Sequence, residues 1–189
     1  MLRPALFLLA AAQAVAAPFP EEFRTFFGAA DGLPGQDIRA IAAAPDGTVY
    51  AGGPGGLARF QSGKWTVIAK EPVLHAAAAG DAAYFLAPDA LYEVRGGSAR
   101  RLAGVAAPQA LAARDGRVAV AAGGRMMEWR GGRLAALAGA PETGAVRQLA
   151  LGPDGALAVA AENGAFLESK GAWRRLYPAR DGRSWGMLD

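Results

Sequence analysis

A stretch of twenty residues that occurs twice constrains the fold more than any other feature of the chain. Residues 38–57, IRAIAAAPDGTVYAGGPGGL, align without a gap to residues 146–165, VRQLALGPDGALAVAAENGA, 108 positions later. Two weaker copies lie between them, and the equivalent turns of the four copies fall at Gly47, Asp81, Gly116 and Gly155. The intervals between these turns are 34, 35 and 39 residues. A period in this range indicates an architecture built from stacked structural repeats.

Each repeat has the pattern of four short strands joined by tight turns. In the first repeat, glycine-containing turns separate the apolar runs TVYAGG, LARF and WTVI, and such turns favour antiparallel hairpins. The alanine-rich stretch LHAAAAGDAA around His75 has helical propensity. It nevertheless falls in register with IRAIAAAPDG, which occupies the inner-strand position of the first repeat. We therefore expect a strand at His75.

Four short antiparallel strands repeated every ~35–40 residues indicate a β-propeller, because blades of this kind bury their faces only against one another. The expected fold is all-β, with about four four-stranded blades within residues 18–189. We assign the blades approximately to residues 31–69, 70–103, 104–138 and 139–177. A β-solenoid is the main alternative, although its coils are usually shorter.

A second similarity indicates that the ring is incomplete. Residues 23–32, FRTFFGAADG, resemble residues 173–182, WRRLYPARDG, which include the outermost strand of the fourth blade. We therefore expect residues 23–27 to be the closing strand of a final blade and residues 178–189 to start a fifth unit. This predicts a partial, open ring from a longer chain; the alternative is a closed four-bladed ring. An open ring exposes blade faces and a strand edge, so we expect association or poor solubility in isolation.

The first residues have the features of a secretory signal peptide, which we assign to residues 1–17. A positive charge at Arg3 precedes an apolar run, and small residues at Ala14 and Ala16 fit an A-x-A cleavage site. The apolar run is shorter than the roughly 20 residues of a membrane-spanning helix. We expect the mature protein to be periplasmic or secreted, with no membrane span beyond the signal peptide.

The composition argues against several kinds of chemistry. The chain has no cysteine and one histidine, so disulfides and thiolate metal sites are excluded and a histidine-based metal site is disfavoured. The net charge is +3, but the arginines are spread along the chain rather than clustered, which argues against nucleic acid as a partner. The motif GRSWG at residues 182–186 fits G-x-S-x-G, yet no acid followed by a histidine comes after it. We expect no catalytic residues, no cofactor and no metal site, and hence no enzyme.

The first repeat also resembles a known family of repeats. Its residues 31–60 contain a Gly-Leu-Pro loop at Gly32-Leu33-Pro34, a hydrophobic inner strand at residues 38–42, an Asp-Gly turn at Asp46-Gly47, an aromatic residue at Tyr50 and a Gly-Leu pair at Gly56-Leu57. This pattern is similar to that of the two-component regulator propeller repeat. The resemblance implies the extracytoplasmic sensor portion of a bacterial signalling protein. It further implies binding of a ligand, often carbohydrate-derived, and transmission of a signal to a partner or to a further module.

Polar residues recur near the start of the predicted inner strands, which line one mouth of a propeller channel. They form the candidate ligand site: Arg39, His75, Gln109, Arg147 and Gln148. Their side chains would bind a small molecule or glycan; a hydrated channel without a specific ligand is the alternative. The predicted function is an extracytoplasmic ligand-binding or sensor module. Two alternatives are a secreted protein–protein scaffold, which would bind a partner through its blade loops, and, less favoured, a propeller-fold lyase or hydrolase.

Overall fold

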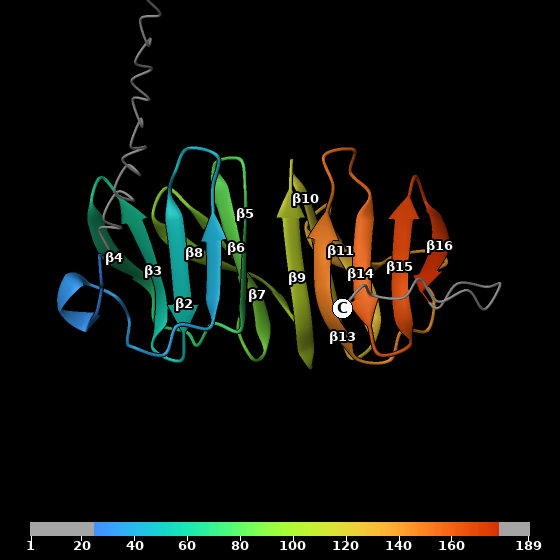
Figure 1. Ribbon diagram of the computed structural model, residues 1–189, viewed down its shortest axis with the longest axis horizontal. Helices are drawn as coiled ribbons and strands as arrows, with labels where there is room; N and C mark the ends of the chain where they lie inside the picture. The colour runs from blue at the N-terminus through green and yellow to red at the C-terminus, as the bar shows by residue number, and fades with distance from the viewer. Residues whose placement is uncertain (1–24, 178–189) are drawn as a thin grey trace, which may run out of the picture.

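The computed structural model describes residues 25–177, and these form four four-stranded antiparallel sheets in chain order (Figure 1). The first sheet contains β1 (Ala40–Ala43), β2 (Val49–Gly53), β3 (Gly56–Gln61) and β4 (Lys64–Ala69). The second contains β5 (His75–Ala79), β6 (Ala82–Leu86), β7 (Ala90–Arg95) and β8 (Ser98–Gly104). The third contains β9 (Pro108–Arg114), β10 (Arg117–Ala122), β11 (Arg125–Arg130) and β12 (Arg133–Ala136). The fourth contains β13 (Val146–Leu151), β14 (Leu157–Ala161), β15 (Gly164–Ser169) and β16 (Ala172–Tyr177).

The expected all-β architecture is confirmed, including the strand at His75, which begins β5. The helical element of the described residues is a single 3-10 turn, η1 (Ala29–Asp31). The described residues therefore contain no helix that could span a bilayer. The tertiary role of the alanine-rich stretch therefore overrides its helical propensity, because alanine also fits the crowded position between neighbouring inner strands.

The first and fourth sheets repeat each other in register as well as in sequence. Ala42 pairs with Tyr50 in the first sheet, and Ala150 pairs with Ala158 in the fourth, again 108 positions later. The turns between these strands are alike, since the carboxylate of Asp46 accepts a hydrogen bond from the Thr48 backbone N–H at 2.9 Å. Asp154 does the same with the Ala156 N–H at 3.1 Å. The Asp-Gly pairs are thus turn residues, whose glycines adopt positive φ.

The sheets pack face to face, and each pair of neighbours encloses its own apolar cluster. Tyr50 and Leu57 of the first sheet belong to the same buried cluster as Phe85 of the second. The next two interfaces are centred on Leu91 and Val120, and on Leu157 with Phe166. Most of these side chains are fully buried, and burying one large apolar side chain contributes about 1.5–3 kcal/mol. Stability therefore depends on neighbouring sheets rather than on any one sheet.

The four inner strands lie side by side in the order β1, β5, β9, β13, as expected around a propeller axis. Their C-terminal ends converge on a pocket of about 280 Å³, to which each sheet contributes: Ala43, Ala79, Arg114 and Leu151. Among the described strands, β13 makes no comparable contact with β1, so the ring is open. Figure 1 shows the first and fourth sheets broadside at opposite ends of the long axis.

Some predictions fall at or beyond the limits of the described chain. The signal peptide, residues 1–17, and the start of a fifth unit, residues 178–189, lie outside the described residues. Of the predicted closing strand at residues 23–27, the described part, residues 25–27, has no strand pairing. Phe27 packs instead against the rings of Phe60 and Trp65, at centroid distances of 5.4 and 6.0 Å. A strand needs a partner strand for its backbone hydrogen bonds, and at residues 25–27 the structure shows none.

Candidate ligand-binding site

The five residues proposed from the sequence lie near the start of the inner strands. His75 and Gln148 occupy the same register position in their sheets, because His75 pairs with Leu86 and Gln148 pairs with Ala160. Arg39, Gln109 and Arg147 precede that position in their own sheets. The sequence pattern therefore placed equivalent residues at one end of neighbouring strands.

The hydrogen bonds and ion pairs of Arg39 and Gln109 join them to neighbouring residues of the chain. Arg39 forms an ion pair with Asp37, in which Nη2 lies 2.6 Å from Oδ2, and both side chains are exposed. Gln109 Oε1 accepts hydrogen bonds from the backbone N–H groups of Gly124, at 3.0 Å, and Val146, at 3.5 Å. Gln109 thus links the third sheet to the fourth.

His75 is half-buried, and Arg147 and Gln148 are exposed on β13. Burial lowers the pKa of His75 below its usual value, so its imidazole is neutral at pH 7. These groups lie near the starts of the inner strands, and the hydrogen bonds and ion pairs of the described residues do not join the five side chains to one another.

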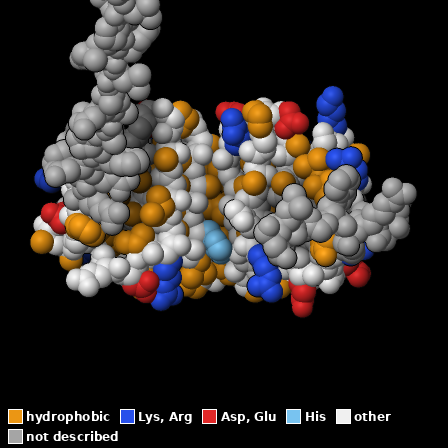
Figure 2. Space-filling view, viewed as in Figure 1, with side chains coloured by type: hydrophobic (Ala, Val, Ile, Leu, Met, Phe, Trp, Pro, Cys, Tyr) orange, Lys and Arg blue, Asp and Glu red, His pale blue; other side chains and the backbone are white. Residues whose placement is uncertain are grey.

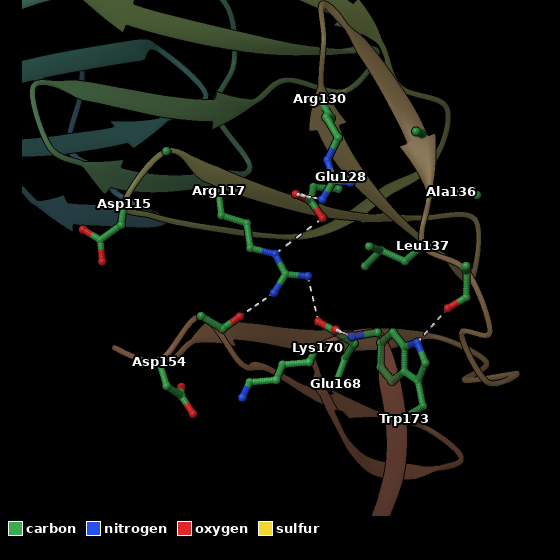
Figure 3. A pocket seen from close by; sticks show the side chains of 15 residues that line it. Asp115, Arg117, Glu128, Arg130, Ala136, Leu137, Asp154, Glu168, Lys170 and Trp173 are labelled. Carbon is green, nitrogen blue, oxygen red and sulfur yellow. Dashed lines mark hydrogen bonds and ion pairs between the residues drawn. The ribbon is translucent and has the colours of Figure 1, made fainter.

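A cleft of about 810 Å³ between the third and fourth sheets is a second candidate site (Figure 3). It opens where three hairpin turns meet, at Asp115-Gly116, Asp154-Gly155 and Lys170-Gly171. Apolar residues of β12 and the following segment, including Leu137, form one wall, and Trp173 of β16 forms another. The cleft therefore combines charged groups, backbone turns and an aromatic side chain.

Arg117, the first residue of β10, is the central cation of this cleft. Its Nη2 lies 2.7 Å from Glu168 Oε2 on the fourth sheet, and its Nε lies 3.4 Å from Glu128 Oε2 on its own sheet. Its Nη1 also donates a hydrogen bond to the Gly155 carbonyl. One guanidinium thus connects two sheets and two carboxylates, as Figure 3 shows. The fixed fork of donors suits this role better than a lysine ammonium would.

The two carboxylates are almost completely buried. Burial raises the pKa of Glu168, but hydrogen bonds from Arg117 and the Gly171 N–H outweigh it, so that the net pKa lies below the usual value. Glu128 Oε1 accepts a hydrogen bond from Arg130 at 3.0 Å. Glu128 Oε2 has no hydrogen-bond partner among the described residues and faces only the Arg117 guanidinium. Arg117 is thus the partner that the two buried carboxylates share.

The third sheet differs from the first two at one repeat position, which pairs with a residue that lines the cleft. The first two sheets have Tyr50 and Tyr84 on β2 and β6, where the third sheet has Ala119 on β10. Each of these residues pairs across the hairpin with a polar side chain, which is Glu93 for Tyr84 and Glu128 for Ala119. The third sheet therefore has no phenol ring beside Glu128, and Glu128 lines the cleft. A comparison of equivalent repeat positions reveals this difference in the sequence, whereas the recurring polar residues at the strand starts do not indicate it.

The lining of the cleft suits a ligand with many hydroxyl groups. Asp115, Asp154 and Lys170 surround the entrance with hydrogen-bond acceptors and donors. The indole of Trp173 is fixed by its Nε1–H, which donates to the Ala138 carbonyl at 3.1 Å. An anchored aromatic surface beside charged groups can contact the apolar face of a sugar ring while the polar groups bind its hydroxyls. Among the described residues, no group of three or more His, Cys, Asp or Glu side chains is arranged to hold a metal ion.

Comparisons with known proteins support the fold alone. No protein-family model matches the chain, and no curated protein sequence matches it. The chain is similar in structure to the WD40 β-propeller domain of Doa1, with a TM-score of 0.58 and 13% identity over 72% of this chain and 53% of that one. It is also similar to streptogramin B lyase, with a TM-score of 0.61 and 13% identity over 75% of this chain and 55% of the lyase.

A third similarity is to an extracellular domain. The extracellular domain of BT4673 from B. thetaiotaomicron, assigned to a one-component system, superposes with a TM-score of 0.60 and 17% identity. The match covers 82% of this chain and 23% of that domain. The chain spans less than two thirds of the length of each of these propellers. At such low identities the common property is the β-propeller fold, to which the four described sheets belong.

Proposed function

We propose that this β-propeller is a ligand-binding module of an extracytoplasmic sensor and that it binds a carbohydrate-derived ligand in the cleft between its third and fourth sheets. The observation that carries the proposal is the cleft itself, which joins the Arg117 cluster to a fixed indole. Similarity in fold to the extracellular domain of a one-component system supports an extracytoplasmic location. Signal output would pass to a partner or to a further module.

In this proposal the module binds its ligand without transforming it. Arg117 has its guanidinium nitrogens engaged by Glu128, Glu168 and the Gly155 carbonyl, which suits a group that shapes a site rather than one that exchanges protons. The polar groups left for a ligand are those at the entrance, where Asp154 and Lys170 are exposed. A reversible complex held by hydrogen bonds and stacking is what these groups can provide.

The test is a glycan array of neutral and acidic oligosaccharides, followed by calorimetry with the strongest array ligand. The variant Ala136→Trp fills the cleft from an exposed position on β12, and we expect at least a tenfold loss of affinity without a change in Tm. The matched control is the double variant Arg39→Ala, Arg147→Ala at the strand starts, which should bind normally. The opposite pattern would move the site to the strand starts, and the absence of any bound glycan would overturn the proposed function.

A further inference from the structure

The hairpin turns between the first two strands of each sheet differ in length along one edge of the molecule. In the first and fourth sheets this turn has five residues, 44–48 and 152–156. In the second and third sheets it has two residues, Gly80-Asp81 and Asp115-Gly116. Figure 1 shows the two longer turns at the upper edge, and Figure 2 shows charged side chains gathered at that edge. Because the inner strands lie in the order β1, β5, β9, β13, the short turns lie between the longer ones.

Two small hollows lie along these turns. The first, which we call the mouth hollow, has about 280 Å³ and lies at the C-terminal ends of the inner strands, where its lining includes Pro45 of the long first turn. The second, which we call the turn hollow, has about 260 Å³ and lies between the Asp115-Gly116 turn and the long turn of the fourth sheet. Arg114, Asp115 and Leu151 line both hollows. The two hollows are therefore neighbours.

The turn hollow also adjoins the cleft between the third and fourth sheets. Four residues line both of them: Asp115, Arg117, Asp154 and Gly155. In Figure 3, Asp115 and Asp154 lie on the two turns next to Arg117. Three adjoining hollows thus run from the mouth of the channel, past the Asp115-Gly116 turn, to the Trp173 wall of the cleft. We call this path the groove.

The sizes of the three hollows indicate that the two smaller ones extend the cleft rather than act as separate sites. Sites for small molecules usually have volumes of ~300–1,000 Å³. The cleft, at about 810 Å³, lies within this range, whereas the mouth hollow and the turn hollow lie below it. A small ligand would therefore occupy the cleft alone, and a long, narrow ligand would occupy all three hollows.

Arg114 is the cation that the groove offers to a ligand at its mouth. Its Nε lies 3.4 Å from Asp115 Oδ2, and both side chains are exposed, so this ion pair contributes little to stability. Within residues 25–177 its side chain makes no other hydrogen bond or ion pair, which leaves its terminal nitrogens to donate to a ligand. Arg117, by contrast, already donates to Glu168 and to the Gly155 carbonyl. The polar groups that remain for a ligand thus continue along the groove beyond the cleft.

We propose that the groove binds a linear oligosaccharide, whose first units occupy the cleft and whose further units pass the Asp115-Gly116 turn to the mouth of the channel. This ligand class rests on the proposed function and makes it more specific: a chain of several sugar units rather than a monosaccharide or a disaccharide. In the mouth hollow, Ala43 and Pro45 contact the C–H groups of a sugar ring, while Arg114 binds its hydroxyls.

The first test compares the affinities of matched disaccharides and hexasaccharides of glucose, mannose, xylose, N-acetylglucosamine and galacturonate, measured by calorimetry. In the series that binds, we expect the hexasaccharide to bind about tenfold more tightly than the disaccharide, the gain from one or two further hydrogen bonds. Ala43→Trp fills the mouth hollow from an exposed position on β1, and Arg114→Ala removes its cation. Both variants should lose this gain in affinity and leave the affinity for the disaccharide unchanged.

The control Ala106→Trp changes an exposed alanine between β8 and β9 and should keep the gain in affinity. Equal affinities for the disaccharide and the hexasaccharide, or a gain that either groove variant retains in full, would overturn the oligosaccharide groove while the cleft remains a glycan site. The absence of binding in every series would overturn the proposed function as well.

The second test maps where each glycan lies. The chain has no cysteine, so Ala43→Cys and Ala136→Cys each introduce a single thiol, the first in the mouth hollow and the second in the cleft. At about ten times its Kd, the hexasaccharide should slow the reaction of either thiol with N-ethylmaleimide about tenfold. The disaccharide should protect only the thiol in the cleft, and the control Ala106→Cys should react at the same rate with either glycan. A hexasaccharide that protects the cleft thiol alone would overturn the proposal.

Discussion

The interface between the second and third sheets and the interface between the third and fourth share one strand framework, but they are filled differently. The second sheet contributes three large side chains to its interface: Tyr84, Leu86 and Leu91. At the same repeat positions the third sheet contributes smaller or more flexible ones: Ala119, Ala121 and Met126. At the turn end of the interface between the second and third sheets, Tyr84 fills the space and its hydroxyl lies 3.4 Å from Glu93. The hollow of about 430 Å³ beside Glu93 is lined by residues of the second sheet alone, so we call this interface closed. The interface between the third and fourth sheets opens into the cleft.

This difference shows how a repeat protein can specialise one interface without changing its backbone. The hairpin pairing of Tyr84 with Glu93 is the same as that of Ala119 with Glu128. Only the side chains differ: Tyr84 lies beside Glu93 in the second sheet, whereas Ala119 lies beside Glu128 in the third, where Arg117 and two carboxylates line the cleft. Because neighbouring sheets contribute separately to stability in repeat architectures, one interface can change while the others continue to hold the array.

The largest expected effect is the conversion of the closed interface into an open one. Tyr84→Ala gives the second sheet the residue that the third sheet carries. We expect a loss of about 3–4 kcal/mol in the free energy of unfolding, since a buried aromatic ring is removed and a cavity remains. Urea denaturation followed by circular dichroism measures it. The control Tyr84→Phe keeps the ring and should lose less than about 1 kcal/mol; equal losses in both variants would contradict the packing explanation.

The sequence alone predicted the four sheets, their order and the open ring, because glycine turns and apolar runs recur at a nearly constant interval. Ala119 shows why it did not predict the cleft. An alanine within the apolar run RVAVAA reads as one more core residue, and its effect appears only when the neighbouring sheet is placed against it. Arg117 and Glu168, 51 positions apart in sequence, are joined only by that packing.

A second, smaller effect tests whether the open interface depends on its central cation. Arg117→Met keeps most of the side-chain volume but leaves the buried carboxylates of Glu128 and Glu168 without their shared partner. We expect the free energy of unfolding to fall by about 2–3 kcal/mol. This is at or below the lower end of the range for breaking a buried ion pair, because Arg117 is partly exposed. The double variant Arg117→Met, Glu168→Gln should recover part of it. Additive losses, measured in a double-mutant cycle, would argue against coupling.

The dependence of stability on pH should differ between the wild type and Glu168→Gln. The pKa of Glu168 in the folded protein lies below that of an unfolded glutamate, about 4.3. Its contribution to stability is therefore present above that pH and is lost as the pH falls through the lower folded value. The free energy of unfolding, measured by urea denaturation between pH 6 and pH 3, should decline more steeply with falling pH for the wild type than for Glu168→Gln. Parallel pH dependences of the two proteins would exclude this contribution.

The smallest expected effect concerns the wall of the cleft. Trp173→Phe removes the hydrogen bond from Nε1 to the Ala138 carbonyl but keeps an aromatic ring against the third sheet. We expect the free energy of unfolding to fall by about 1 kcal/mol, the usual net contribution of one hydrogen bond. The matched change Trp129→Phe, in the closed interface, provides the comparison. If the hydrogen bond holds the Trp173 indole in the wall of the cleft, glycan affinity falls in Trp173→Phe and is unchanged in Trp129→Phe. Equal affinities in the two variants would show that this hydrogen bond does not contribute to glycan binding.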